Sequence, residues 1–219
     1  MDFSIKTFDA KSILTTTKAG CIAVGVFEGK QLSAAAQQLD ASGEISGAVK
    51  AGDISGKAGS TLLLRRVAGV SAERVLLVGL GKETIISQKD FGSALRAIAS
   101  TCASIGAADA LIALPIENIE NGSAAWAIET AVHAICQHAY RFDSLKSKHD
   151  PVASGVKKFT FVVGATDSAT AKTAIAQSVA LAHGMQLTKD LGNLPANICT
   201  PTYIADTAKK LAKEFKLGI

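Results

Sequence analysis

Histidine is the side chain in this sequence best suited to proton transfer or metal binding, and four are present. His133 and His138 are five positions apart, so on a helix they point about 140° away from each other and cannot share a metal. Glu129 lies four positions before His133, but two ligands without a third do not make a catalytic metal centre, and an ordinary side-chain pair is favoured. His149 lies in a polar loop and His183 on a long helix, each without a partner recognisable in the sequence.

Glycines mark a second place where chemistry could occur. Gly79-Leu-Gly81 follows an expected strand and precedes an expected helix, which is the position of a dinucleotide-binding fingerprint. The third glycine of that fingerprint is missing, because position 84 is Thr. We therefore interpret the two glycines as serving the geometry of a strand-to-helix turn.

Nucleophile and phosphate-binding signatures are absent from the sequence. It contains no G-x-S-x-G elbow, no H-E-x-x-H and no P-loop. The amides of Asn193 and Asn197 could orient a ligand, but capping and bracing the turn between two helices is the favoured interpretation. No residue is assigned to catalysis, to cofactor binding or to a metal.

Composition and cysteine spacing limit the class of protein. Apolar residues make up 48% of the chain, which suits an α/β domain, and no apolar run approaches the roughly 18 residues of a membrane span. The N-terminus alternates like a strand and lacks the features of a signal peptide, so a cytoplasmic protein is expected. Cys21, Cys102, Cys136 and Cys199 are far apart and are expected to be reduced, mostly in the core, rather than in a zinc site or disulfide scaffold.

The net charge of +4 raises the possibility of nucleic-acid binding. Four lysines and one glutamate within residues 209–219 account for three of these charges. The lysines give one helix a polar face opposite Leu211, Ala212 and Phe215, and we favour a solvated face over a DNA-binding patch. These lysines are Lys209, Lys210, Lys213 and Lys216.

Hydrophobic patterning alternates strands with helices, which predicts a sheet covered on both faces, with parallel pairs at least in its second half. Strands are expected at 4–8, 21–27, 61–67, 74–80, 110–114 and 158–163, and the third and fourth form a hairpin. Helices are expected at 33–39, 45–50, 87–105, 123–140 and 168–191, with another starting at 200–201.

The helix at 168–191 is apolar on more than one side, which is typical of a helix buried between units. Ile175, Val179 and Ala182 form one line, and Leu181 and Met185 form a second. If a partner is missing, exposed apolar surface on this helix predicts self-association or a mobile helix.

A corner follows that helix. Gly192 is expected to end it in the left-handed cap conformation, and Pro195 cannot continue it. Thr200 then caps the next helix, and Pro201 occupies its first turn.

The corner and several upstream segments carry a family resemblance. The chain resembles the N-terminal part of the leucyl aminopeptidases, the cytosol aminopeptidase family of two-metal peptidases, and the resemblance covers essentially the whole chain. The matching segments are Asp190-Leu-Gly-Asn-Leu-Pro-Ala-Asn-Ile-Cys-Thr-Pro201, Cys21-Ile-Ala-Val-Gly-Val-Phe-Glu28, Gly59-Ser-Thr-Leu-Leu-Leu64, Glu73-Arg-Val-Leu-Leu-Val-Gly-Leu-Gly-Lys82 and Arg141-Phe-Asp-Ser-Leu-Lys146.

The resemblance implies an α/β fold: a macro-domain-like three-layer sandwich with a mixed sheet, helices on both faces and a long C-terminal linker helix. It implies a macro-like domain at 1–165, a linker helix at 166–192 and a truncated start of the catalytic domain at 193–219. The parent enzyme would be a cytoplasmic hexamer that releases N-terminal residues from peptides, leucine among the preferred ones. This domain would support assembly and shape access to the active site.

The resemblance also implies that the parent binds two divalent ions, commonly manganese or zinc. The family's metal-ligand signature, Asn-Thr-Asp-Ala-Glu-Gly-Arg, does not occur here, nor does its Gly-Leu-Thr-Phe-Asp-Ser-Gly-Gly segment. The chain on its own is therefore expected to hold no cofactor and to be inactive.

Two alternatives remain open at the level of sequence. Gly52-Asp-Ile-Ser55 weakly resembles a Gly-Asp-Ile-Thr segment of macro domains, which would suit a nucleotide- or ADP-ribose-binding module. The terminal lysines would suit a DNA-binding accessory domain, whose affinity would fall steeply with added salt.

Overall fold

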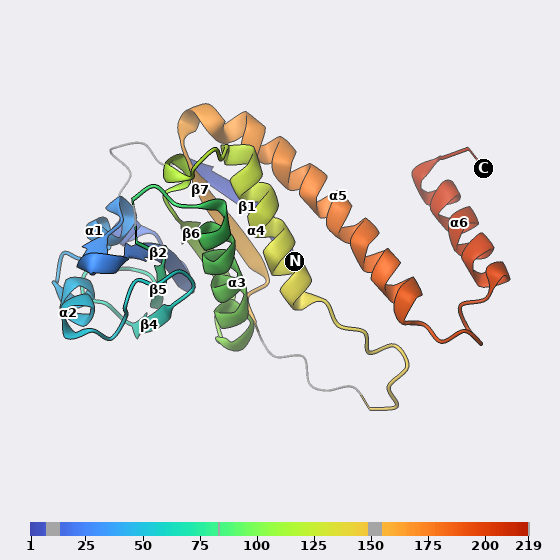
Figure 1. Ribbon diagram of the computed structural model, residues 1–219, viewed down its shortest axis with the longest axis horizontal. Helices are drawn as coiled ribbons and strands as arrows, with labels where there is room; N and C mark the ends of the chain where they lie inside the picture. Colours follow the sequence, from blue (N-terminus) through green and yellow to red (C-terminus); the bar gives the residue numbers. More distant parts are fainter. Residues whose placement is uncertain (8–13, 83, 149–154, 219) are drawn as a thin grey trace.

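The computed structural model describes residues 1–7, 14–82, 84–148 and 155–218, which form a three-layer α/β sandwich extended by two helices (Figure 1). The sheet has seven strands in the order β1-β7-β6-β2-β5-β4, with β3 paired to β2. The strands are β1 Asp2–Thr7, β2 Cys21–Phe27, β3 Gln31–Leu32, β4 Thr61–Arg65, β5 Arg74–Gly79, β6 Asp109–Ala113 and β7 Lys158–Val163.

The helices also lie close to their predicted positions. The α-helices are α1 Ala34–Leu39, α2 Glu44–Ala51, α3 Gln88–Ser104, α4 Ala124–Ala139, α5 Ser168–Asn193 and α6 Pro201–Phe215. Short 3-10 turns lie at Leu14–Thr16, Glu28–Lys30, Ile116–Asn118 and Ala165–Asp167. The predicted fold class is confirmed. Phe8, the end of the first predicted strand, lies outside the described residues.

Strand pairing follows the predicted pattern. In the sheet order β1-β7-β6-β2-β5, each strand pairs parallel with the next. β4 and β5 form the antiparallel hairpin expected from the sequence, and β3 pairs antiparallel with β2. The predicted strand at 61–67 ends early because Arg66 takes a positive φ of 57°.

Helices cover both faces of the sheet, because the central strands are apolar on both sides. Every residue of β2 is buried. Cys21 and Ala23 pack into the core beneath α3, α4 and the start of α5, whereas Ile22 and Val24 pack into the core beneath α1 and α2.

Hydroxyl caps explain where several helices begin. Backbone N–H groups in the first turn of a helix have no acceptor within the helix, and the side chain of the preceding N-cap residue can accept a hydrogen bond from one of them. Ser87 accepts from Asp90, Ser123 accepts from Trp126, and Thr200 accepts from Tyr203 as predicted.

The predicted end of the long helix is wrong by two residues. Gly192 is part of α5 and does not form a left-handed cap; the helix continues to Asn193. It ends because Pro195 forces Leu194 out of the helical region, to φ −70° and ψ 137°. The N–H of Leu194 still donates to the carbonyl of Asp190, at 3.2 Å.

α5 packs on the sandwich with its first half and extends past it with its second half (Figure 1). Ala171, Ala174 and Ser178 form its buried face, and Ile175 and Val179 are half-buried. The predicted exposed apolar surface is present, because 62% of Leu181 is exposed. Met185, assigned to the same line, is instead half-buried. Self-association stays a prediction.

Gly79, the last residue of β5, provides a first test of the fold. A Cβ added at Gly79 would collide with the carbonyl oxygen of Lys57, so Gly79→Ala should lower the free energy of unfolding by about 1–3 kcal/mol. Gly106→Ala is the matched control, because no atom lies within 4 Å of its added Cβ, and it should change stability by less than about 0.5 kcal/mol. Urea denaturation measures both variants; equal midpoints would contradict the close approach.

Candidate functional site

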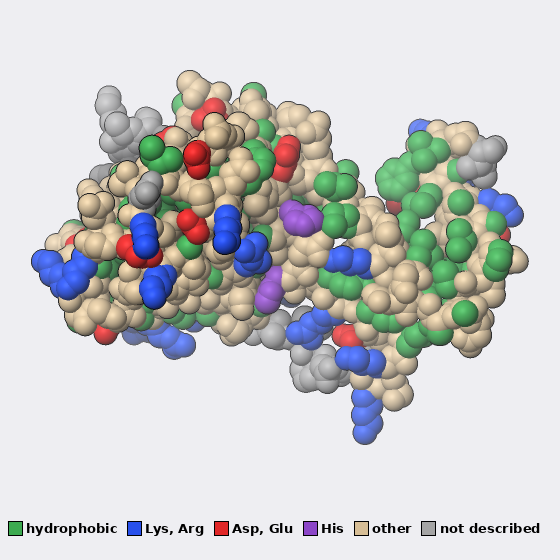
Figure 2. Space-filling view, in the orientation of Figure 1, with side chains coloured by type: hydrophobic (Ala, Val, Ile, Leu, Met, Phe, Trp, Pro, Cys, Tyr) green, Lys and Arg blue, Asp and Glu red, His purple; other side chains and the backbone are tan. Residues whose placement is uncertain are grey.

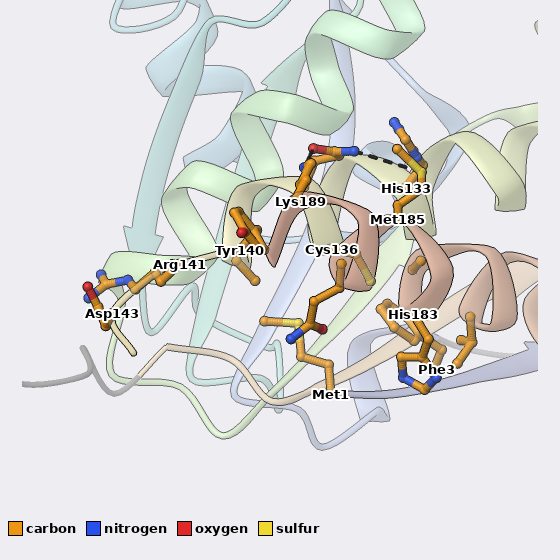
Figure 3. A pocket seen from close by; sticks show the side chains of 15 residues that line it. Met1, Phe3, His133, Cys136, Tyr140, Arg141, Asp143, His183, Met185 and Lys189 are labelled. Atoms are coloured by element: carbon orange, nitrogen blue, oxygen red, sulfur yellow. Dashed lines mark hydrogen bonds between the residues drawn. The ribbon is translucent and has the colours of Figure 1, made fainter. Parts of the chain in front are cut away.

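A hollow lies at the seam between α4 and α5, beside the start of β1 (Figure 3). Its volume is about 390 Å³. Phe3 comes from β1, His133 and Cys136 come from α4, and Val179 and Met185 come from α5.

Polar side chains join the ends of the two helices next to this hollow. The hydroxyl of Tyr140 donates to Asp190 Oδ1 at 3.0 Å, and Asn193 Nδ2 donates to the Tyr140 oxygen at 3.0 Å. Lys189 Nζ donates to Gln137 Oε1 and lies 4.8 Å from the centre of the Tyr140 ring. The last turn of α5 is therefore held against the end of α4.

This network corrects the interpretation of the two asparagines. Asn193 does not brace the turn between α5 and α6, because its amide reaches back to Tyr140 on the other helix. Asn197 is exposed. The sequence contained no signal for this contact, because residues 140 and 193 are brought together only by the packing of α5 on α4.

A second hollow, of about 460 Å³, lies at the carboxyl ends of β6 and β7, where open α/β sheets commonly bind ligands. Glu117 and Asp167 line it, and no lysine or arginine among the described residues does. Two carboxylates disfavour a diphosphate. Asp53, from the segment that resembles a macro domain, does not line this hollow. The geometry gives no support to the ADP-ribose alternative.

The glycines at the end of β5 serve the backbone, as interpreted. Gly79 lies too close to Lys57 for a side chain, and Gly81 has a φ of 100°. The N–H of Gly81 donates to Gly56 at 3.0 Å, and its carbonyl accepts from Glu28 at 2.8 Å. Backbone groups that a phosphate would need are already engaged within the protein.

The histidines do not converge. His133 and His183 line the α4–α5 hollow, whereas His138 is exposed outside it. His149 lies outside the described residues. Glu129 and His133 line a neighbouring hollow together, but no hydrogen bond joins them in the described structure, so the expected pair is not formed. Among residues 1–7, 14–82, 84–148 and 155–218, no group of three or more His, Cys, Asp or Glu could hold a metal ion.

All four cysteines are free thiols. Cys21 and Cys102 are buried as predicted, and burial raises the pKa of each to about 12. Cys136 is half-buried in the α4–α5 hollow, where burial also raises its pKa, and Cys199 is half-buried near the corner. The two core thiols are therefore protonated and unreactive at neutral pH.

The terminal helix has the polar face that the lysine spacing predicts, but its apolar face is largely open. Lys209 pairs with Asp206 at 3.3 Å. Ala212 is buried, whereas 50% of Ile204 and 61% of Phe215 are exposed. Figure 2 shows hydrophobic side chains gathered over α6. No helix in the described ranges has the length and hydropathy needed to cross a membrane.

Residues 23–149 match the sequence model described as "Cytosol aminopeptidase family, N-terminal domain". The chain belongs to the cytosol aminopeptidase family. It is 63% identical over its full length to a probable cytosol aminopeptidase of Herminiimonas arsenicoxydans, and it covers 44% of that relative. It is 46% identical over 225 aligned residues to the corresponding protein of Paraburkholderia phymatum, of which it covers 45%. The chain thus spans less than half the length of these family members.

Solved structures agree with the fold. A mutant of tomato leucine aminopeptidase aligns over 99% of this chain and 43% of its own, with a TM-score of 0.75 and 23% identity. The bottromycin maturation enzyme BotP aligns over 91% of this chain and 38% of its own, with a TM-score of 0.63 and 22% identity. The sandwich and the helices that follow it therefore share their fold with part of these larger proteins.

The Tyr140 network predicts a pH effect. Partial burial raises the pKa of Tyr140; Asp190 raises it further, and the hydrogen bond from Asn193 lowers it. The sequence has two tyrosines, so Tyr203→Phe leaves Tyr140 as the one tyrosine chromophore. Ultraviolet titration of this variant should give a higher midpoint in the native state than in urea, where tyrosine titrates near about 10.

The sign of the accompanying stability effect follows from linkage. Because the folded pKa is the higher one, the stabilisation is fully present below the unfolded pKa and is lost as pH rises through the folded pKa. Asp190→Asn, added to Tyr203→Phe, should lower the native midpoint. An identical midpoint with and without Asp190 would show that the carboxylate does not act on Tyr140.

Proposed function

We propose that this chain is the N-terminal domain, linker helix and first catalytic-domain helix of a metal-dependent leucyl aminopeptidase. The observation that carries the proposal is the full-length match to probable cytosol aminopeptidases, of which the chain covers 44–45%. The parent is proposed to be a cytoplasmic two-metal exopeptidase, hexameric, that releases N-terminal residues from peptides with a preference for leucine. The proposed divisions are 1–165, 166–192 and 193–219.

The proposed division of labour assigns catalysis to the rest of the parent. The described residues do not fit a two-metal centre, because they hold no group of three or more suitable ligands. A BotP structure, one of those similar in fold, is a complex with Mn. We propose manganese or zinc for the parent, held by residues beyond this chain.

The role proposed for this domain is to support assembly and shape access to the active site. Two surfaces support it. α5 extends past the sandwich with Leu181 exposed, and α6 presents Ile204 and Phe215 beside a basic face. Apolar surface of this kind on consecutive helices is typical of a protein interface, and we assign it to contacts with the rest of the longer chain.

Activity tests the division of labour. The purified 219-residue chain, supplied with manganese and L-leucine p-nitroanilide, should release no nitroaniline above the buffer rate. The protein extended to the length of its relatives should release it, and removing the metal with EDTA should abolish that release. Turnover by the short chain that co-purifies with it through two orthogonal columns would overturn the assignment.

Stability of the longer protein tests the interface. Ile204→Asp should have a small effect in the 219-residue chain, because the side chain is 50% exposed there. In the longer protein it should lower the free energy of unfolding by about 2 kcal/mol or more, because a charge would be buried. Thr202→Asp, also exposed on α6, is the matched control. Equal effects of Ile204→Asp in both lengths would contradict the proposed interface.

A further inference from the structure

We propose that the hollow between α4 and α5 binds a small organic carboxylate with an apolar body. The carboxylate would pair with Lys189, and the body would lie against Phe3, Val179 and Met185. The proposal goes beyond the proposed aminopeptidase activity, and the ligand need not be a peptide substrate.

The ammonium of Lys189 is the first reason. The side chain is half-buried and is held by two neutral groups, the amide oxygen of Gln137 and the ring of Tyr140. Asp190 is the neighbouring carboxylate, but it accepts the Tyr140 hydroxyl. Among the described residues, no carboxylate lies within ion-pair distance of Lys189. A partly desolvated charge without a counter-ion favours an anionic ligand.

Gln137 holds this ammonium in place. Its amide oxygen accepts from Lys189, and its amide nitrogen donates to the sulfur of Met185 at 4.0 Å. The two contacts fix which way the amide points, so the ammonium is positioned before a ligand arrives. Preorganisation of this kind reduces the entropic cost of binding.

The walls supply the apolar half of the site. Phe3 is half-buried and stacks on Phe159 with ring centroids 5.9 Å apart, so its position is set by the core. Thioether and aromatic surfaces favour a flat apolar body. The volume of about 390 Å³ falls in the range of about 300–1,000 Å³ that is usual for small-molecule sites.

The remaining charges at the rim do not oppose an anion. Asp143 lines the hollow but pairs with Lys146 at 2.7 Å, and Arg141 lies at the same end. His133, His183 and Gln186 also line the hollow, and Figure 3 labels the two histidines. The hollow at the carboxyl ends of β6 and β7 has a different charge pattern, because its described lining contains the carboxylates of Glu117 and Asp167 and no lysine or arginine.

Calorimetric titration of the 219-residue chain with 1-naphthoate tests the charge requirement, and uncharged 1-naphthamide is the matched probe. The chain should bind 1-naphthoate more tightly. Lys189→Met should weaken 1-naphthoate binding about tenfold and leave 1-naphthamide binding unchanged, because it removes the charge and keeps the apolar stem. Lys172→Met, an exposed lysine of α5 that does not line the hollow, should behave as the unmodified chain.

A filling variant keeps the proposal testable if Lys189→Met disturbs the helix. Ala182 lines the hollow, so Ala182→Trp should block both probes while far-ultraviolet circular dichroism stays unchanged. Amide chemical shifts should move in α4 and α5 on binding. Equal affinity for the two probes, no effect of Lys189→Met on a folded chain, no binding at millimolar concentration, or shifts confined to α6 would each overturn the proposal.

Discussion

The structure depends on a parallel sheet whose central strand is buried on both faces. Each residue of β2 is shielded from water, so helices must cover both sides of the sheet. α1 and α2 cover one side, and α3, α4 and α5 cover the other. Because the central strand is buried on both faces, helices must pack on both faces of the sheet. Connections between parallel strands of one sheet are almost always right-handed crossovers.

Length then decides what lies outside the sandwich. A helix of 26 residues spans roughly 39 Å, whereas the six-residue strand before it spans roughly 20 Å. α5 can cover the sheet with its first half only. The second half of α5 lies beyond the sheet and packs against the end of α4. The hollow at their seam is a consequence of that mismatch in length.

Much of the fold could be predicted because its signals are local. Ser87, Ser123 and Thr200 cap helices through bonds to amides three residues away, so their meaning can be read from neighbouring residues. The strand predicted at 74–80 is observed as β5, Arg74–Gly79. The prediction that α5 ends with Gly192 in a left-handed cap was wrong, because glycine permits this conformation without requiring it. Pro195 determines the end of the helix instead.

The seam could not be predicted, because it rests on pairs of residues about 50 positions apart. From the sequence, Lys189 has no assigned role and Asn193 is interpreted as part of a turn. Their contacts with Gln137 and Tyr140 arise only when α5 lies beside α4. Periodicity identifies which side of a helix is apolar, but it does not identify the neighbour that this side meets.

The sequence by itself determined the approximate positions of most strands and helices, their alternation, the family resemblance and the absence of the family's metal-ligand signatures. These properties are written in short segments, whose conformations follow from nearby residues. The tertiary structure alone decided which side of α5 is buried, where its overhang begins, and that the ammonium of Lys189 faces an apolar hollow with neutral partners. Those outcomes depend on how α5 packs against the sheet and α4, which cannot be read from the residues of one short segment.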